Sequence, residues 1–378
     1  MKLHHGIYIH IPFCPQRCPY CNFFSLVKKI PSVFSSSLIH EFSIRKQAWS
    51  SEARSIYFGG GTPSLLPLSQ VKKIVESLNT RTNEISIEIN PEHARNTYLK
   101  KLKAIGISRV SLGIQSLDNS SLKQLNRNHD KKKAHAAIKN AKNANFKSIS
   151  IDLIIGLKED STIKTLDDIL KKSKIDHISI YPLQIKPFTL FNRSIKNPNL
   201  YNNILKSFSQ LITFTKKNKF IQYEFSSFSS SKKHECLHNK LYWNSKNYLG
   251  IGPSAHSMLN LPDGSRLRSH NHFNLSKYVE KPNPISFYEE VLSPKESFLE
   301  SCWLGLRNLK DGISLIPLLK LHQINIKNQK TYKKIFSQLK FKKKQFNIKI
   351  HSYNCIQKQQ SPITQQVFNL IMKSINQI

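Results

Sequence analysis

Six short segments in the first half of the chain alternate between apolar and polar residues, and stretches with helical character separate them. The segments cover residues 6–11, 55–58, 84–89, 109–114, 148–154 and 177–182. Strands that alternate with helices are typical of βαβ units, which build a parallel sheet. The sequence therefore predicts an α/β fold with six βα units.

The alternation also predicts which face of each strand is buried, because successive strand side chains point to opposite faces. One face is apolar throughout, as in Ile7, Ile9 and Ile11, and we expect it to pack on the helices. The other face consists of Tyr8, His10, Glu84, Ser86, Glu88, Ser111, Gly113, Gln115, Ser148, Ser150, Asp152, Ser179 and Tyr181. A packed barrel interior would contain bulky Val, Ile and Leu, so a polar interior predicts a lumen that holds a ligand. A half-exposed antiparallel sheet would alternate in the same way, but the intervening helices favour the parallel arrangement.

Three cysteines follow the first predicted strand with the spacing Cys-x3-Cys-x2-Cys, at Cys14, Cys18 and Cys21. This spacing allows one short loop to place three thiolates around an iron–sulfur cube. A four-iron cluster normally takes four cysteines, so three leave one iron open to a small molecule. From spacing alone, a zinc site or ordinary buried thiols remain open alternatives.

The other three cysteines, Cys236, Cys302 and Cys355, are scattered, so the six together do not resemble a disulfide framework. No apolar run approaches 18 residues, and no signal peptide precedes the first strand. We therefore expect a cytoplasmic protein in a reducing compartment.

The formal net charge is +35, from 58 Lys and Arg against 23 Asp and Glu. Such an excess is typical of proteins that bind nucleic acid or an anionic membrane surface. Here the lysines are spread along the chain with Asn and Ile, as A+T-rich codon usage would produce, and aromatic residues do not interleave with them as in a strand-binding groove. We expect no specific nucleic acid partner and at most weak association with an anionic membrane.

The residues around the cysteines resemble those of a known family. The segment His10-Ile-Pro-Phe-Cys14 and the triplet Pro19-Tyr-Cys21 are similar to the radical S-adenosylmethionine (SAM) superfamily, and within it to the oxygen-independent coproporphyrinogen oxidase-like group. That group contains an oxidase and a heme chaperone. The resemblance implies a partial (β/α)6 barrel and a [4Fe-4S] cluster on Cys14, Cys18 and Cys21. It also implies that SAM chelates the open iron.

Further motifs match this family in order, and the resemblance implies that they contact SAM. The first is Gly59-Gly-Gly-Thr-Pro63 after the second strand, where glycines let the backbone approach a ligand. Any one of these polar residues could equally form a structural salt bridge. The residues carried over from the family are Tyr8, Tyr20, Gly60, Gly61, Thr62, Glu88, Gln115, Arg127 and Asp152.

Three features distinguish the chaperone from the oxidase. Phe23 occupies the position where the oxidase has an additional cysteine, and only seven residues precede Tyr8. The segment His238-Asn-Lys-Leu-Tyr-Trp243 is similar to the His-Asn-x-x-Tyr-Trp motif of HemW-type heme chaperones. By this resemblance His238 is expected to ligate heme iron, with the rings of Tyr242 and Trp243 beside the porphyrin. Without the motif, a lone histidine is more often an ordinary core or surface residue.

Three regions are expected: a radical SAM barrel at 1–195, a barrel-closing extension with the heme motif at 196–290, and a small helix-rich C-terminal domain at 291–378. The resemblance fades after about residue 310, and a disordered basic tail is the alternative there.

The sequence favours a heme chaperone that passes heme to an acceptor protein, and it leaves open whether the chain is an enzyme. The alternative is an oxygen-independent coproporphyrinogen III oxidase or dehydrogenase, which removes carboxyl groups from two propionates through a 5′-deoxyadenosyl radical. A radical SAM enzyme acting on RNA is a third possibility, which depends on the charge alone.

Overall fold

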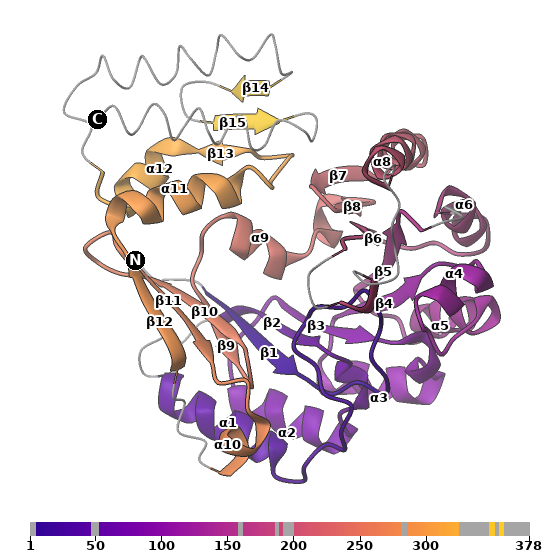
Figure 1. The fold of residues 1–378 in the computed structure, drawn as a ribbon, viewed down its shortest axis with the longest axis horizontal. Coiled ribbons are helices and arrows are strands. Elements are labelled where there is room, and N and C mark those ends of the chain that lie inside the picture. Colours follow the sequence, from indigo (N-terminus) through magenta and orange to yellow (C-terminus); the bar gives the residue numbers. More distant parts are fainter. Residues whose placement is uncertain are drawn as a thin grey trace.

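A computed structural model describes residues 5–46, 53–157, 162–185, 189–191, 200–280, 286–324, 348–351 and 355–358. Within these residues, twelve strands form one curved sheet in the order β12-β11-β10-β9-β1-β2-β3-β4-β5-β6-β8-β7. The central six strands run parallel, and helices follow them on the outer side (Figure 1). The sheet is an open, partial (β/α)6 barrel, so the predicted fold class is confirmed.

The six predicted strands are all present, with ends within two residues of those expected. The alternating residues divide as predicted, because the isoleucines of β1 and their equivalents in the other strands belong to the buried core. Each such side chain contributes about 1.5–3 kcal/mol when it is fully buried. The bounds are β1 His5–Ile11, β2 Ala53–Gly60, β3 Glu84–Ile89, β4 Arg109–Gln115, β5 Ser148–Ile155 and β6 His177–Pro182.

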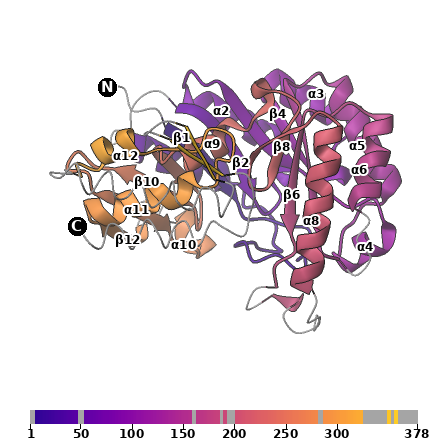
Figure 2. The ribbon, with the colours of Figure 1, turned by 90° about the horizontal axis from the view of Figure 1, so that it is seen from above.

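Helices cover the outer face of these strands (Figures 1 and 2). In α2, Val71, Ile74 and Leu78 are spaced at one helical turn, and all three are buried against the sheet. Asp130 caps α5 by accepting a hydrogen bond from the backbone N–H of Lys133 at 2.8 Å. The bounds are α1 Phe34–Arg45, α2 Leu68–Leu78, α3 Asn96–Ile105, α4 Asn119–Gln124, α5 Lys131–Asn143, α6 Thr162–Lys172 and α8 Leu200–Lys217, with short 3-10 helices η2 Pro63–Leu65 and η3 Pro91–His93.

The extension after the barrel adds strands to both edges of the sheet. β7 (Ile221–Glu224) and β8 (Ser227–Ser229) continue it beyond β6. After η4 (Lys232–His234), helix α9 (Leu237–Trp243) leads across to β9 (Tyr248–Ile251), which pairs parallel with β1.

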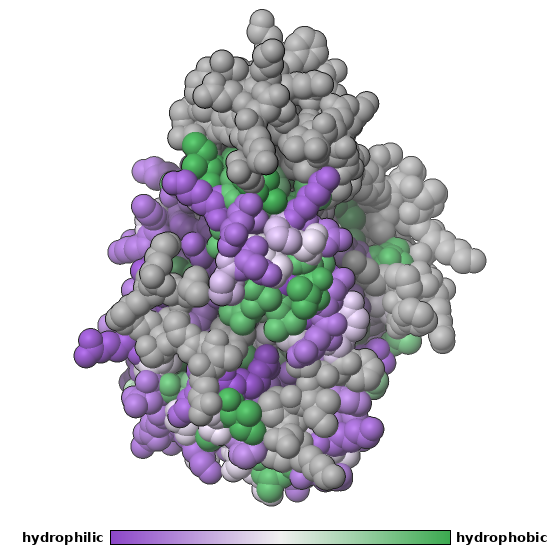
Figure 3. All heavy atoms as spheres, turned by 90° about the vertical axis from the view of Figure 1, so that its left-hand side faces the viewer, coloured by the Kyte–Doolittle hydropathy of each residue, from purple (hydrophilic) through white to green (hydrophobic). Residues whose placement is uncertain are grey.

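β10 (His256–Asn260), β11 (Arg266–Asn271) and β12 (Ser286–Leu292) complete this edge as antiparallel strands, with α10 (Leu275–Glu280) between the last two. Figure 3 views the molecule from the side on which β12 lies and shows apolar side chains among hydrophilic ones. On β12, Val291 is exposed. No helix within the described ranges has the length and apolar character needed to span a bilayer.

The C-terminal region contains α11 (Pro294–Gly305), α12 (Leu315–Leu321) and a three-stranded sheet that the helix-rich expectation did not include. That sheet consists of β13 (Ile313–Ser314), β14 (Ile348–His351) and β15 (Cys355–Lys358). Most of residues 320–378, where a helix-rich domain was expected and a basic tail was the alternative, lie outside the described residues, as do 192–199 at the predicted end of the barrel.

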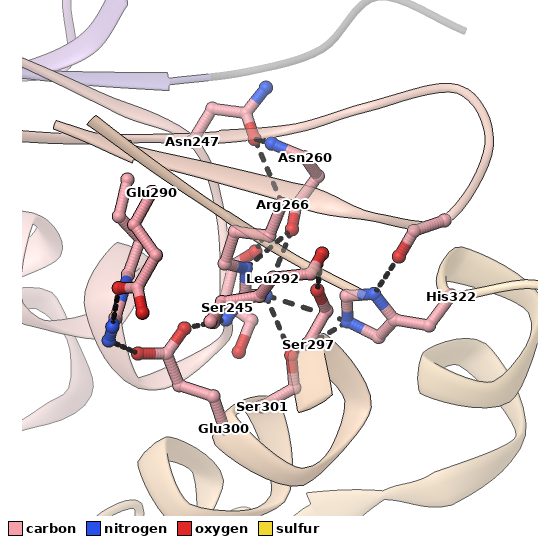
Figure 4. Close-up of polar contacts among 12 residues, drawn as sticks. Ser245, Asn247, Asn260, Arg266, Glu290, Leu292, Ser297, Glu300, Ser301 and His322 are labelled. Carbon is pink, nitrogen blue, oxygen red and sulfur yellow. Dashed lines mark hydrogen bonds and ion pairs between the residues drawn. The ribbon is translucent and has the colours of Figure 1, made fainter. Parts of the chain in front are cut away.

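The buried side chain of Arg266 joins β11 to α11 and to the segment after α12 (Figure 4). Its guanidinium forms an ion pair with Glu300 at 2.7 Å and donates to Asn260 at 2.9 Å and to Ser301 at 2.7 Å. The imidazole of His322 lies beside Ser301 Oγ at 2.8 Å. Every charge here has a partner, as buried ions require.

Candidate cofactor and ligand site

The polar face of the strands surrounds a cavity of about 630 Å³. This volume lies within the range of cofactor and small-molecule sites. Residues predicted to point inward line it from four strands: Glu88, Ser111, Gly113, Gln115, Ser150, Asp152, Ser179 and Tyr181. The prediction of a polar, ligand-holding lumen is therefore supported by the structure.

The cysteine loop lies at the carboxyl end of β1, and Cys14, Cys18 and Cys21 all line the cavity with partly exposed side chains. Backbone hydrogen bonds from Cys14 N to Leu26 O (3.0 Å) and from Leu26 N to Pro12 O (2.6 Å) hold the loop. Burial raises the pKa of the Cys14 and Cys21 thiols. In the described residues, no three or more His, Cys, Asp or Glu side chains gather as they would around one metal ion.

His10, on β1, holds the cysteine loop in place through a side-chain hydrogen bond. Its Nε2 donates to the carbonyl oxygen of Phe24 at 3.0 Å, so Nδ1 is left to accept from the hydroxyl of Tyr8 at 3.0 Å. Burial lowers the pKa of His10 to about 4, which keeps the ring neutral. Tyr8 was predicted to contact SAM, but it is not one of the described residues that line the cavity. Tyr20, from the loop, is one of them.

The glycine loop after β2 passes so close to the cysteine loop that side chains would not fit. A Cβ on Gly61 would lie 2.7 Å from the carbonyl oxygen of Phe13 and 2.9 Å from Cys14 Sγ. Gly60 has a φ of +115°, which L side chains rarely adopt. Thr62 Oγ1 donates to Cys14 Sγ at 3.6 Å. Gly60, Gly61 and Thr62, which were predicted to contact SAM, all line the cavity.

Two buried carboxyl groups lie on the inner face of the sheet. Glu88 accepts from the hydroxyl of Tyr57 at 2.9 Å, and Asp152 accepts from Ser111 Oγ at 2.9 Å. Burial raises the pKa of Glu88 to about 7, and the charge of Asp152 adds to this shift. Burial likewise raises the pKa of Asp152 to about 6. Carboxyl groups in such a setting favour a ligand with cationic or hydroxyl groups.

Arg127 and Gln115 lie close to the cysteine loop. Arg127 donates to Asn90 Oδ1 at 2.8 Å and to the carbonyl of Gly113 at 3.0 Å, and its second terminal nitrogen lies 3.9 Å from Cys18 Sγ. Gln115 has a φ of +62° where the pairing of β4 and β5 shifts register. A non-glycine residue in this conformation at a ligand cavity is typical of a functional position.

His238 lies outside the cavity wall. Its Nδ1 is 2.8 Å from Ser55 Oγ, near the amino end of β2, and its Nε2 is 2.7 Å from the hydroxyl of Tyr242. The ring stacks on Tyr57 at 5.2 Å, and burial lowers the pKa of His238 to about 3. The structure therefore places this residue against inward-facing residues near the amino ends of β1 and β2, with both ring nitrogens in hydrogen bonds.

Several cavity residues were not predicted as site residues. Arg109 and Tyr57 share the inward parity of their strands, so the alternation could have identified them. Asn239 and Arg307 also line the cavity, from α9 and from the turn after α11, and no local pattern in the sequence indicates this. His256, on β10, is exposed, with its ring centroid 5.1 Å from that of His270.

Together these groups form a cavity with three thiols and an arginine near the carboxyl ends of the strands and two protonatable carboxyl groups farther in. Such a cavity can hold a cysteine-liganded cluster beside a polar, charged cofactor.

Comparison with known proteins agrees with this geometry. The model of the radical SAM superfamily matches residues 8–205. A protein named heme chaperone HemW from Buchnera aphidicola (subsp. Schizaphis graminum) is 35% identical over 289 residues, which cover 72% of this chain and 75% of that protein. Heme chaperone HemW from Escherichia coli is 32% identical, over 70% of this chain and 72% of its own.

A solved structure of coproporphyrinogen III oxidase (HemN) from Escherichia coli superposes with a TM-score of 0.77. It covers 100% of this chain and 91% of its own, at 21% sequence identity, so this likeness shows the fold alone. The sequence matches identify the family within this fold. The chain belongs to the radical SAM superfamily and, within it, to the family of the HemW heme chaperones.

Proposed function

We propose that this protein is a heme chaperone that binds heme and passes it to an acceptor protein. The observation that carries the proposal is the similarity to proteins named heme chaperone HemW over about 70% of the chain. The cavity supports it, because it joins a cysteine loop typical of a cluster site to Asn239 of α9, the helix that contains the His238–Trp243 motif.

The residues of the loop fit a [4Fe-4S] cluster held by Cys14, Cys18 and Cys21. When bound, the cluster supplies one iron without a protein ligand, at which SAM can chelate. The close approach of Gly61 to Cys14 leaves no room for a side chain, and Thr62 and Arg127 direct hydrogen-bond donors at two of the sulfur atoms. Such donors stabilise thiolates, whose charge burial otherwise opposes.

Glu88, Asp152, Gln115 and Arg127 are our proposed contacts for SAM. Ionised carboxylates on this face would accept hydrogen bonds from ribose hydroxyls or from the amino group, and the positive charge of SAM would favour their ionisation. Tyr20 closes the cavity beside the loop. Tyr8 acts through His10 on the position of the loop rather than by direct contact.

His238 remains our proposed heme ligand, and the structure defines what ligation requires. Burial keeps the imidazole neutral, which is the form that binds iron. Because both nitrogens are in hydrogen bonds, one bond must be exchanged for iron, and Nε2 can be freed by moving Tyr242 on the same short helix.

The test is a heme titration of the anaerobically reconstituted protein, of His238→Ala and of His40→Ala, in which an exposed histidine of α1 serves as the control. We expect a shifted absorption band and weaker binding in His238→Ala, with cluster content and SAM binding unchanged, and an unaltered His40→Ala. A folded His238→Ala protein with the affinity and spectrum of the unaltered chain would refute the ligand assignment.

A further inference from the structure

The guanidinium of Arg307 is held at the cavity wall between two tryptophan rings. Arg307 follows α11, is half-buried and lines the cavity together with Asn239 and Phe225. The carbon at the centre of its guanidinium lies 5.3 Å from the ring centroid of Trp243 and 5.0 Å from that of Trp303. These are cation–π distances, so the two rings restrict where the guanidinium can point.

The surrounding hydrogen bonds fix this arrangement. Phe225 N donates to the carbonyl oxygen of Arg307 at 3.2 Å, and Arg307 Nη1 donates to the carbonyl oxygen of Trp303 at 3.3 Å. Trp243 Nε1 donates to the buried carboxyl group of Glu224, which also accepts from Asn239 Nδ2 at 3.0 Å. Arg307 is therefore oriented before any ligand arrives.

Two other arginines of the same protein show how a structural arginine is neutralised. Arg266 pairs with Glu300 at 2.7 Å (Figure 4), and Arg109 lies 3.9 Å from Glu84. By contrast, none of the described carboxyl groups forms an ion pair with Arg307. Partial burial lowers the pKa of Arg307, because the guanidinium charge loses hydration and no described anionic side chain compensates for that loss. An anionic ligand in the cavity would restore the missing partner.

We propose that Arg307 is a carboxylate-binding residue of the cavity and that its ligand is a propionate group of heme. The inference rests on the proposed function for the identity of the ligand. The planar guanidinium matches a carboxylate with two parallel hydrogen bonds, and the two tryptophan rings hold it in place for that contact. SAM also contains a carboxylate, so the experiment separates the two sources.

The test compares heme with heme dimethyl ester, in which both propionates are uncharged, on the unaltered protein, Arg307→Gln, Arg307→Lys and the control Arg95→Gln, an exposed arginine. The unaltered protein and Arg95→Gln should bind heme about 10- to 100-fold more tightly than the ester. Arg307→Gln should lose that preference, while its affinity for the ester and for SAM stays the same. Arg307→Lys should recover part of the preference.

If Arg307→Gln keeps the full preference for heme, or if its SAM affinity falls while its heme affinity does not, the inference is wrong. Because the ester is also tested on the unaltered protein, equal affinity for heme and ester there overturns the inference even if Arg307→Gln fails to fold. Failure of the unaltered protein to bind either compound would refute the proposed function itself.

Discussion

The cysteine loop and α9 contain the two most diagnostic motifs of the chain, yet the structure presents them in different ways. The three thiols of the loop face the cavity, and their neighbours point at them. On α9, His238 lies in a hydrogen-bonded site outside the cavity lining, whereas Asn239 lines the cavity. The cysteine site is therefore open to the cavity, whereas the His238 site is closed, with both ring nitrogens in hydrogen bonds.

The largest expected effect concerns the open site. Replacing Cys14, Cys18 or Cys21 with Ser should abolish the visible charge-transfer absorption that reconstitution produces, because two thiolates are too few to anchor the cube. The matched controls are Cys236→Ser and Cys302→Ser, whose buried thiols lie outside the loop and should leave the absorption intact. A cluster that survives Cys18→Ser would show that the loop is not its site.

The closed site should respond to substitution with a loss of stability. His238→Ala removes two buried hydrogen bonds and leaves a cavity, so we expect the free energy of unfolding to fall by about 2–4 kcal/mol. Tyr242→Phe removes only the bond to Nε2 and should reduce it by about 1 kcal/mol. If Nε2 binds iron, Tyr242→Phe should keep or raise heme affinity despite its lower stability. Equal loss of heme binding in both variants, measured by titration, would indicate that α9 is purely structural.

The two carboxyl groups predict how SAM binding depends on pH. The pKa of Glu88 lies at about 7 and that of Asp152 at about 6, so both lose protons as the pH rises from about 6 to about 8. Their ionised forms should bind SAM better, and affinity should rise about tenfold over this interval. Asp152→Asn should flatten this pH profile and weaken SAM binding without loss of iron. Arg127→Ala should weaken SAM binding at every pH, also without loss of iron. Unchanged affinity in both variants would make these residues structural.

The same shift acts on stability in the opposite direction. The raised pKa of Glu88 means that the ligand-free folded state binds its proton more tightly than the unfolded chain does. This contribution is fully present below the unfolded pKa of 4.5 and is lost as the pH rises through about 7. Glu88→Gln should therefore remove part of the decline in thermal stability measured between about pH 5 and about pH 7. A decline as steep as that of the unaltered protein would contradict the assignment.

The smallest expected effect concerns the net charge of +35. If the lysines reflect composition rather than a binding surface, affinity for RNA or for anionic vesicles should be weak and should collapse as salt rises to physiological strength. Fluorescence anisotropy across a salt series would measure this. A salt-resistant complex with one RNA would restore the hypothesis of an RNA-directed enzyme.

The sequence was sufficient to predict the strands of the barrel but not the side-chain contacts between segments that lie far apart in the chain. Alternation located β1 to β6 and divided their residues correctly, because a strand with one buried face must repeat every second residue. It could not show that Tyr8 supports the cysteine loop through His10, since that depends on side-chain packing between segments. Nor could it bring Arg307 to Trp243, because two residues more than sixty positions apart meet only in the tertiary fold.

The central claim is that this member of the superfamily binds heme instead of consuming a porphyrin precursor. The most direct measurement incubates one anaerobically reconstituted sample with SAM, a reductant and coproporphyrinogen III, follows decarboxylation by mass spectrometry, and titrates the same preparation with heme. The account predicts saturable heme binding and no loss of carboxyl groups from coproporphyrinogen III. Decarboxylation of two propionates without measurable heme affinity would contradict it and identify the chain as an oxidase.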